Sequence, residues 1–311
     1  NLILSGTNTY SGVTDINAGT LIAQNGFGIG DSSQVDVAAG ATFQIDADEG
    51  IGYLTGAGTT ELNGNDLTLL GNAAGSPGTA FSGTFANSGL GTSGVLKKGT
   101  GELYLSGNNS ATDWQLTIYN GTVKVGNVNA LTNSTGTAVS VLAPITGATA
   151  PNTLETDAVL NLATNFDIGS GSELKVGGAN DMTLSGILSG YSLGLNMDAA
   201  TDTLTLTNAN NSLSQIRLLN GTLIVTDTSA LGGAELQGFG AGTTLDVTTA
   251  TTLSSTFALN TGSNTIVKAN NGVTLDMTGS STIGSGSLTL GDGVDANTFQ
   301  IADTLAHTGS T

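Results

Sequence analysis

The densest group of carboxylates in the sequence is Asp46-Ala47-Asp48-Glu49. Side chains two positions apart on a strand project from one face, so Asp46 and Asp48 are expected to lie side by side. Carboxylate oxygens are ligands for Ca²⁺, and paired carboxylates supply the acid and base of many enzymes that cleave polysaccharides. We therefore take Asp46, Asp48 and Glu49 as a candidate calcium site. The alternative is a solvated acidic loop.

A second candidate is aromatic. Trp114 is the only tryptophan and follows Asp113 in a polar stretch, with Tyr104 and Tyr119 close by in the sequence. An exposed ring of this kind stacks on a sugar or anchors a protein partner. We take Trp114, Asp113, Tyr104 and Tyr119 as candidate binding residues. The alternative is that the tryptophan caps an edge of the fold.

Residues for nucleophilic or acid-base catalysis are scarce. His307 is the only histidine and lies four residues from the end of the sequence, and there is no cysteine. Gly30-Asp31-Ser32-Ser33 resembles the Gly-Asp-Ser context of some serine hydrolases, but Asp and Ser in this order are typical of a turn. No phosphate-binding loop or dinucleotide fingerprint is present. We expect no enzyme activity, and no cofactor apart from the candidate calcium ion.

The composition predicts an all-β chain. The 311 residues include 47 glycines and three prolines, and Thr, Asn and Ser fill much of the remainder. These are weak helix formers, whereas Thr and Val favour strands and Gly and Asn favour turns. Hydrophobic residues make up 38% of the chain in short alternating runs, which is enough for a core.

The charge of the chain excludes several classes of partner. Six basic residues against 24 acidic ones give a formal net charge of −18, which repels nucleic acids and anionic lipids. No run of about 18 apolar residues exists to cross a membrane as a helix. The sequence begins at Asn1 without a signal segment, so we expect it to be a piece of a longer protein.

Two short signatures recur along the chain at an interval of about 100 residues. Leu-Ile-Leu-Ser-Gly at 2–6 returns at 103–107 and more loosely at 204–208, and both offsets are 101 (103 − 2 and 204 − 103). Each copy is followed by a Gly-Thr pair flanked by alternating apolar residues, which indicates two strands joined at a glycine corner. We place the copies near 1–45, 94–142 and 204–247. The expected structural positions are Gly6, Gly19, Thr20, Gly107, Gly121, Thr122, Gly221 and Thr222.

Strands this short cannot bury an apolar face alone, but stacked coils give every strand a neighbour and a shared interior. We therefore predict one solenoid over residues 1–311, with coils of about 22 residues. Residues 71–93, rich in Gly and Ser and containing Phe81 and Phe85, are the expected site of an irregular insertion. A sandwich or barrel of antiparallel hairpins, for which Asn-Gly turns are suited, is the alternative.

Residues 1–23 closely resemble the passenger-associated strand repeat of bacterial autotransporters. Residues 94–125 resemble it too, including the lead-in Gly-Val-Leu-Lys-Lys-Gly-Thr-Gly at 94–101. The third copy departs from the pattern, because Asn208 replaces the glycine after its strand. The resemblance implies a right-handed parallel β-helix displayed on the surface of a Gram-negative cell, after export through a C-terminal barrel that this sequence is not expected to contain.

The resemblance and the absence of an obvious catalytic set favour an adhesin or aggregation passenger. Its partners would be proteins or glycans on host or bacterial cells, or further copies of itself. The alternatives are a structural stalk or surface-layer segment, and a polysaccharide-active β-helix enzyme. An exposed apolar patch on one face would separate an adhesin from a stalk, and carboxylates gathered along a groove would favour the enzyme.

Overall fold

A computed structural model describes residues 1–72, 78–89, 93–143, 151–226, 228–238 and 240–249, and then the short segments 251–253, 257–259, 264–269, 274–277, 281–283, 287–291, 298–301 and 305–307. These residues form strands, turns and one 3-10 helix, η2 (Thr228–Leu231), and none of them is α-helical. None of their helices is long and apolar enough to cross a membrane. The chain, expected as one segment, divides into two compact units, Asn1–Asp157 and Ala158–Thr311.

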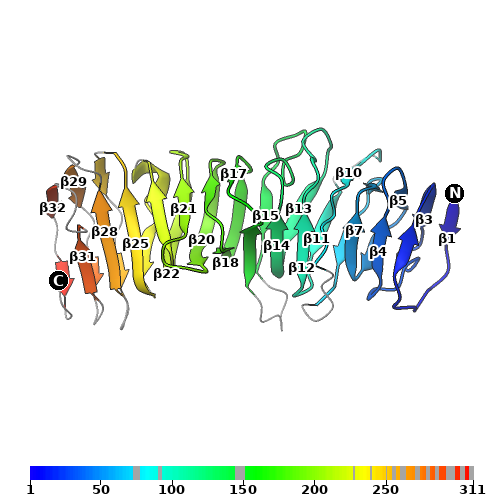
Figure 1. Cartoon of the computed structure of the whole chain (residues 1–311), viewed down its shortest axis with the longest axis horizontal. Helices are drawn as coiled ribbons and strands as arrows, with labels where there is room; N and C mark the ends of the chain where they lie inside the picture. Colours follow the sequence, from blue (N-terminus) through cyan, green and yellow to red (C-terminus); the bar gives the residue numbers. More distant parts are fainter. Residues whose placement is uncertain are drawn as a thin grey trace. The chain divides into compact units, whose positions relative to one another are not determined.

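The first unit consists of parallel strands stacked in columns (Figure 1). One column contains β1 (Leu2–Leu4), β3 (Thr20–Ala23), β5 (Thr42–Ile45), β8 (Thr59–Glu61) and β10 (Thr84–Ala86). A second contains β2 (Thr14–Ile16), β4 (Gln34–Val37) and β7 (Tyr53–Gly56). A third contains β6 (Glu49–Ile51), β9 (Leu67–Leu69), β11 (Gly94–Lys97), β13 (Gln115–Ile118) and β15 (Val139–Val141). The fourth contains β12 (Glu102–Leu105), β14 (Gly121–Val125) and β16 (Asn152–Thr156).

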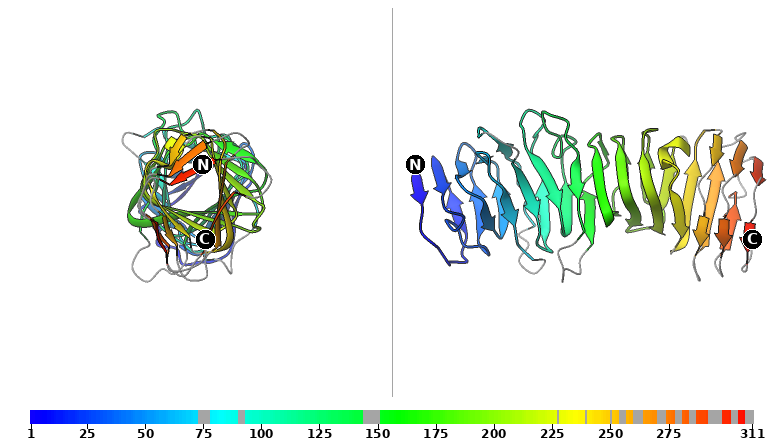
Figure 2. Two further views of the ribbon diagram at one scale, coloured as in Figure 1. Left: turned by 90° about the vertical axis from the view of Figure 1, so that its left-hand side faces the viewer. Right: turned by 180° about the vertical axis from the view of Figure 1, so that it is seen from behind.

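The second unit repeats this arrangement, and Figure 2 shows its strands from the opposite side. One column contains β17 (Leu160–Leu162), β19 (Met182–Leu184), β21 (Thr203–Leu206), β23 (Thr222–Val225), β25 (Ala241–Val247), β28 (Asn264–Ala269) and β31 (Ser287–Leu290). Another contains β18 (Phe166–Gly178), β20 (Leu188–Met197), β22 (Ser212–Asn220), β24 (Glu235–Gly238), β27 (Phe257–Leu259), β30 (Ser281–Ile283) and β33 (Leu305–His307). The third contains β26 (Thr251–Leu253), β29 (Thr274–Met277) and β32 (Thr298–Ile301).

The predicted all-β parallel solenoid is confirmed. Alternate residues of the short strands face the interior, as in β14, where Val123 and Val125 are buried and Thr122 and Lys124 are half-buried. Coil length follows from the register. It varies from 17 residues (60 − 43, between β5 and β8) to 31 (154 − 123, between β14 and β16), around the expected value of about 22.

Part of the predicted insertion at 71–93 lies in a regular coil. Strand β10 pairs in register with β8, and Phe81 forms parallel bridges to Gly56 and Leu105. The rings of Phe81 and Phe85 are both fully buried. Residues 73–77 and 90–92 lie outside the described residues.

Each repeat copy turns a corner at its glycine. Gly19, Gly121 and Gly221 have φ values of 75°, 82° and 106°, in the left-handed region that favours glycine. Thr20, Thr122 and Thr222 follow with half-buried side chains. At the other signature, Gly107 is required by close packing of the backbone. A Cβ atom there would lie 1.9 Å from the carbonyl oxygen of Gly83. Gly6 has no neighbour within 4 Å of such an atom.

An asparagine near the start of each copy joins successive coils. Asn109 accepts a hydrogen bond from the Phe85 amide of the preceding coil (3.0 Å) and donates one to the Ala130 carbonyl of the next (2.9 Å). Asn211 does the same with Leu188 (2.8 Å) and Ala230 (2.7 Å). Both side chains are buried, so each satisfies backbone groups that water cannot reach.

In each copy, the residue that follows the carbonyl bonded to the asparagine side chain is buried in the core. Asn8 of the first copy donates to Gly28 (2.8 Å), and the next residues in the three copies are Ile29, Leu131 and Leu231, all buried. Their spacings of 102 and 100 residues (131 − 29 and 231 − 131) match the sequence repeat. Each copy of the repeat therefore carries an asparagine whose side chain is hydrogen-bonded to a neighbouring coil, which we call the asparagine clamp. The next coil carries a buried apolar residue directly after the carbonyl that accepts this hydrogen bond.

We predict that Asn109→Ala destabilises the first unit by about 2–4 kcal/mol, because it leaves the Phe85 amide and the Ala130 carbonyl buried without partners. Asn109→Asp should be no better, since a carboxylate cannot donate to Ala130. The matched control is the exposed neighbour Asn108→Ala, which should cost less than about 1 kcal/mol. Urea unfolding followed by the fluorescence of Trp114 measures both. Equal losses in Asn108→Ala and Asn109→Ala would contradict the clamp.

A lysine occupies an interior position of β11. Lys97 is 2% exposed and pairs in register with Leu69 and Ile118. Its Nζ donates hydrogen bonds to the carbonyls of Gly99 and Asn120. Burial lowers the pKa of this ammonium group from 10.5 to about 8, because the charged form loses its hydration.

This shift predicts a pH-dependent stability. Below about pH 8 the folded and unfolded chains both carry the proton, and the folded chain bears a penalty of about 3 kcal/mol. Between pH 8 and 10.5 the unfolded chain binds more protons, so Lys97 adds stability as pH rises. The urea midpoint of the protein relative to Lys97→Met should therefore increase over this range. Lys98→Met is the control, and midpoints of wild type and Lys97→Met that run parallel with pH would refute the prediction.

Candidate functional site

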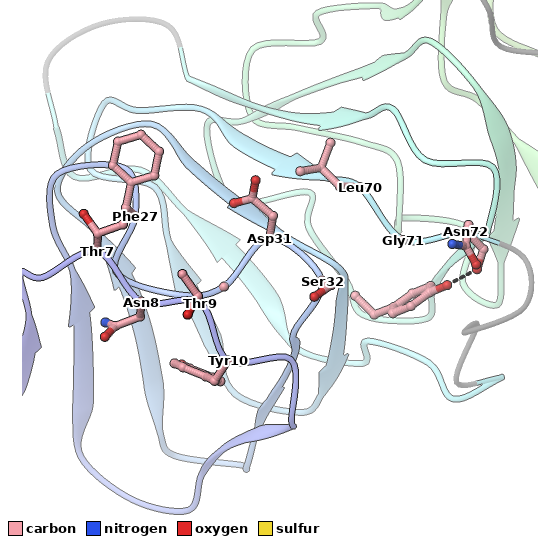
Figure 3. A pocket seen from close by; sticks show the side chains of 12 residues that line it. Thr7, Asn8, Thr9, Tyr10, Phe27, Asp31, Ser32, Leu70, Gly71 and Asn72 are labelled. Atoms are coloured by element: carbon pink, nitrogen blue, oxygen red, sulfur yellow. Dashed lines mark hydrogen bonds between the residues drawn. The ribbon is translucent and has the colours of Figure 1, made fainter.

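A hollow of about 510 Å³ opens on the first unit, where residues from four successive coils come together (Figure 3). It lies among the loop after β1, the segment between β3 and β4, the start of β7 and the residues after β9. Its lining combines aromatic, hydroxyl, amide and carboxylate side chains, namely Thr7, Asn8, Thr9, Tyr10, Phe27, Asp31, Ser32, Tyr53, Leu70 and Asn72, with Gly30 and Gly71.

The loop after β1 is tied to the next coil by backbone and side-chain hydrogen bonds. The Asn8 amide donates to the Phe27 carbonyl (3.0 Å), and its side chain donates to Gly28 (2.8 Å). At the other end of the loop, the Ser33 hydroxyl donates to the Tyr10 carbonyl (2.8 Å). These bonds fix the first wall of the hollow.

Phe27 is presented by a tight turn. Asn25 and Gly26 both have positive φ (67° and 72°), and a Cβ atom at Gly26 would lie 2.7 Å from the Asp48 carbonyl oxygen. Beyond the turn, alternate side chains face opposite ways, so Ile29 is buried and the Phe27 ring is 56% exposed. A large apolar ring is thus held in solvent by a segment whose own backbone is packed closely.

Glu49 braces this turn from within the fold. Its side chain is buried and accepts hydrogen bonds from the backbone amides of Gly28 (3.2 Å) and Ile29 (3.0 Å). Burial raises the pKa of the Glu49 carboxyl above its usual value, the two amides oppose the rise, and the nearby charge of Asp31 adds to it. Glu49 therefore positions Phe27 and does not face the solvent.

The side chains of Asp31 and Leu70 both pack next to Gly50. A Cβ atom at Gly50 would lie 3.1 Å from Asp31 Oδ1 and 3.2 Å from Leu70 Cδ1, so the absence of a side chain there makes room for both. In Figure 3 the Asp31 carboxylate lies between the Phe27 ring and the Leu70 side chain. Asp31 is exposed and accepts no hydrogen bond from another described residue. It is a carboxylate available to a ligand beside an apolar group.

Two tyrosines complete the walls. The Tyr53 ring lies against Gly71, and its hydroxyl donates to the Asn72 carbonyl. The Tyr10 ring is 38% exposed, and its hydroxyl is hydrogen-bonded to Thr14 (2.8 Å). The arrangement can bind a small ligand through ring faces and hydrogen bonds, as is typical of small-molecule sites.

A second hollow, of about 460 Å³, lies on the second unit. There the Arg217 guanidinium forms an ion pair with the Glu173 carboxylate across Gly194, whose missing side chain leaves the space. The charged groups of this hollow therefore bind each other. The first hollow, with exposed rings and a carboxylate that accepts no hydrogen bond from another described residue, is the stronger candidate.

The predicted calcium ligands engage separate partners. Asp46 accepts hydrogen bonds from the side chains of Gln44, Gln24 and Asn63, and that from Gln44 contributes most to lowering its pKa. Asp48 accepts the Asp66 amide (2.9 Å), and Glu49 faces inward as described. Within the described ranges, no three His, Cys, Asp or Glu side chains are gathered to hold a metal ion. The calcium site stays a prediction.

The prediction that Trp114 is a binding residue is wrong. Its ring is 1% exposed and stacks on Phe85 at a centroid distance of 4.4 Å, and Phe85 in turn contacts Phe81 at 5.1 Å. The indole donates to the Thr132 carbonyl (3.2 Å). These three rings form an aromatic core across two coils, so the tryptophan binds the fold together and cannot meet a ligand.

The other three predicted binding residues, Asp113, Tyr104 and Tyr119, are at least partly exposed and make different contacts. Asp113 is exposed, while Tyr104 and Tyr119 are half-buried. Tyr104 donates to Asp157, and this hydrogen bond raises its pKa to about 12. The Nζ of Lys124 lies 5.1 Å from the centre of the Tyr104 ring, and that of Lys98 lies 5.6 Å from the centre of Tyr119. Both tyrosines already have cationic partners, and their role in binding stays a prediction.

The hollow itself was missed by reasoning from the sequence. Its parts come from residues 7–10, 27–32, 53 and 70–72, and only the stacking of coils brings them together. The one available signal was Gly-Phe-Gly-Ile-Gly at 26–30, where glycines flank a single large ring. The turn expected at 30–33 is present at Asp31 and Ser32, which both line the hollow.

Comparison with known proteins adds one finding. A family model described as the passenger-associated-transport-repeat matches residues 1–23 and 95–125, which are the first two sequence repeats. No curated protein and no solved structure is significantly similar to the chain. Strands β21 and β23 of the third copy nevertheless stack in register, as β12 and β14 do in the second. The chain therefore carries the repeats of an autotransporter passenger on a parallel β-solenoid.

Proposed function

We propose that this passenger segment is adhesive and binds the surface of host or sister cells. The observation that carries the proposal is the exposed hollow on the first unit, where Phe27 and Leu70 are 56% and 39% exposed beside an unpaired Asp31. Large exposed apolar side chains grouped at a concave site are typical of binding surfaces. A stalk has no need of them.

The rest of the outer surface supports the same role. Thr20, Thr42, Thr59 and Thr84 pair in register on neighbouring strands, and all four are half-buried. Such a column of hydroxyls both donates and accepts hydrogen bonds over a flat area. It keeps the face soluble and offers many weak contacts to a partner.

The passenger repeat implies surface or extracellular display. Attachment to the outer membrane of a Gram-negative cell belongs to the same proposal. No observation in the described residues favours a polysaccharide-cleaving reaction, since the predicted carboxylates Asp46, Asp48 and Glu49 engage separate partners.

Adhesion is tested with beads that carry the chain. Coated beads should bind to epithelial cells or bacterial cells well above the level of beads coated with the urea-unfolded chain, because the hollow exists only in the stacked coils. Microscopic counting of attached beads measures this. Binding no greater than that of the unfolded control on every cell type would leave a structural stalk as the function.

The net charge of −18 makes a separate prediction about self-association. Two acidic faces repel each other over about 10 Å at 0.1 M salt, and added salt shortens that range. Any contact between copies should therefore strengthen with salt or divalent cations. Sedimentation at 20 mM and 500 mM NaCl measures it. A fall in association on adding salt would show that attraction between charges drives the contact.

A further inference from the structure

We propose that the hollow on the first unit binds a neutral sugar residue of a cell-surface glycan. This inference rests on the proposed adhesive function and names the chemistry of its partner. A pyranose ring presents a face of C–H groups and an edge of hydroxyls. A complementary site offers an aromatic face and, beside it, strong hydrogen-bond acceptors.

The aromatic part of the site is Phe27. Its ring is 56% exposed yet rigidly presented, because the turn at Asn25 and Gly26 and the two hydrogen bonds to Glu49 fix the backbone on both sides. A ring fixed before binding loses little conformational entropy when a ligand stacks on it. Tyr10, 38% exposed on the adjoining loop, offers a second ring to the same ligand.

The polar part is Asp31. Its carboxylate accepts no hydrogen bond from another described residue, and it stands next to the apolar Leu70 over Gly50. A carboxylate accepts hydrogen bonds from two neighbouring hydroxyls at once, and such charge-assisted bonds are stronger than neutral ones. The hydroxyls of Thr7, Thr9 and Ser32 line the same hollow and can both donate and accept.

The charge of the site argues for a neutral ligand. Among the described residues, no Lys, Arg or His lines the hollow, and Asp31 adds to a chain whose net charge is −18. A sialic acid, a uronic acid, a sulfated sugar or a phosphate would therefore be repelled.

The stacking of strands argues against a peptide. One common way for an extended peptide to bind is to add to a free strand edge. Near the hollow, β3, β4 and β7 lie within columns, and β3 and β4 are each paired on both sides. The hollow lies at loops and corners, where it offers side chains and few free backbone groups.

The test measures binding of the whole chain to immobilised neutral oligosaccharides that end in galactose, glucose, mannose or fucose, and to sialylated and sulfated counterparts. Phe27→Ala should weaken binding to the preferred neutral glycan by about tenfold or more, Phe27→Leu should weaken it less, and Asp31→Asn should weaken it about tenfold. The matched controls are Val128→Ala, which removes another exposed apolar side chain, and Asp15→Asn, which removes another exposed charge. Both should bind as the wild type does.

The results separate this inference from the adhesive function. Unchanged urea midpoints, followed by Trp114 fluorescence, will show that the variants fold. If coated beads attach to cells and the Phe27→Ala beads attach equally well, the sugar inference is overturned and adhesion stands. Attachment that survives periodate oxidation of cell glycans but is lost after protease treatment identifies a protein partner and likewise overturns it. Binding to no neutral glycan, or stronger binding to the anionic ones, also contradicts it.

Discussion

Most interior strands of this protein pair with the strand one coil earlier and the strand one coil later, and depend on both for their backbone hydrogen bonds. A strand of three to five residues buries too little apolar surface to be stable by itself. The ladder of backbone hydrogen bonds between coils and the shared apolar interior must therefore form together. This constraint explains why the repeat specifies contacts between coils. The clamps at Asn109 and Asn211 each reach one coil back and one coil forward.

The same constraint accounts for polar groups in the interior. Lys97 replaces an apolar residue in the core column of β11 and is tolerated because two backbone carbonyls at the neighbouring corner receive its hydrogen bonds. Glu49 is buried for a similar reason, since it satisfies two amides of a turn on the preceding coil. In both cases the buried charged side chain forms hydrogen bonds to backbone groups of the fold, which offset part of the cost of burying it.

The candidate binding site lies at the corners between strands, where the backbone ladder stops. Most strands are paired on both sides by strands of neighbouring coils, whereas the corners can vary in length and chemistry without breaking the stack. Segments of four successive coils line the hollow, and the turn that carries Phe27 is held by contacts to Asp48 and Glu49 of the next coil. The turn is packed and hydrogen-bonded from within, so the proposed site would be formed before a partner binds.

The sequence alone determined the architecture. The 101-residue interval, the glycine corners at 19, 121 and 221 and the alternation of apolar residues are local signals, and they led to a parallel solenoid of short coils. Tertiary structure alone decided which side chains of the irregular stretches face inward. Trp114 lies in a polar stretch without periodicity, so its stacking on Phe85 of the preceding coil had no sequence signal. Coil lengths that range from 17 to 31 residues set which corners adjoin, and for that reason the hollow around Phe27 and Asp31 could not be read from residues 7 to 72.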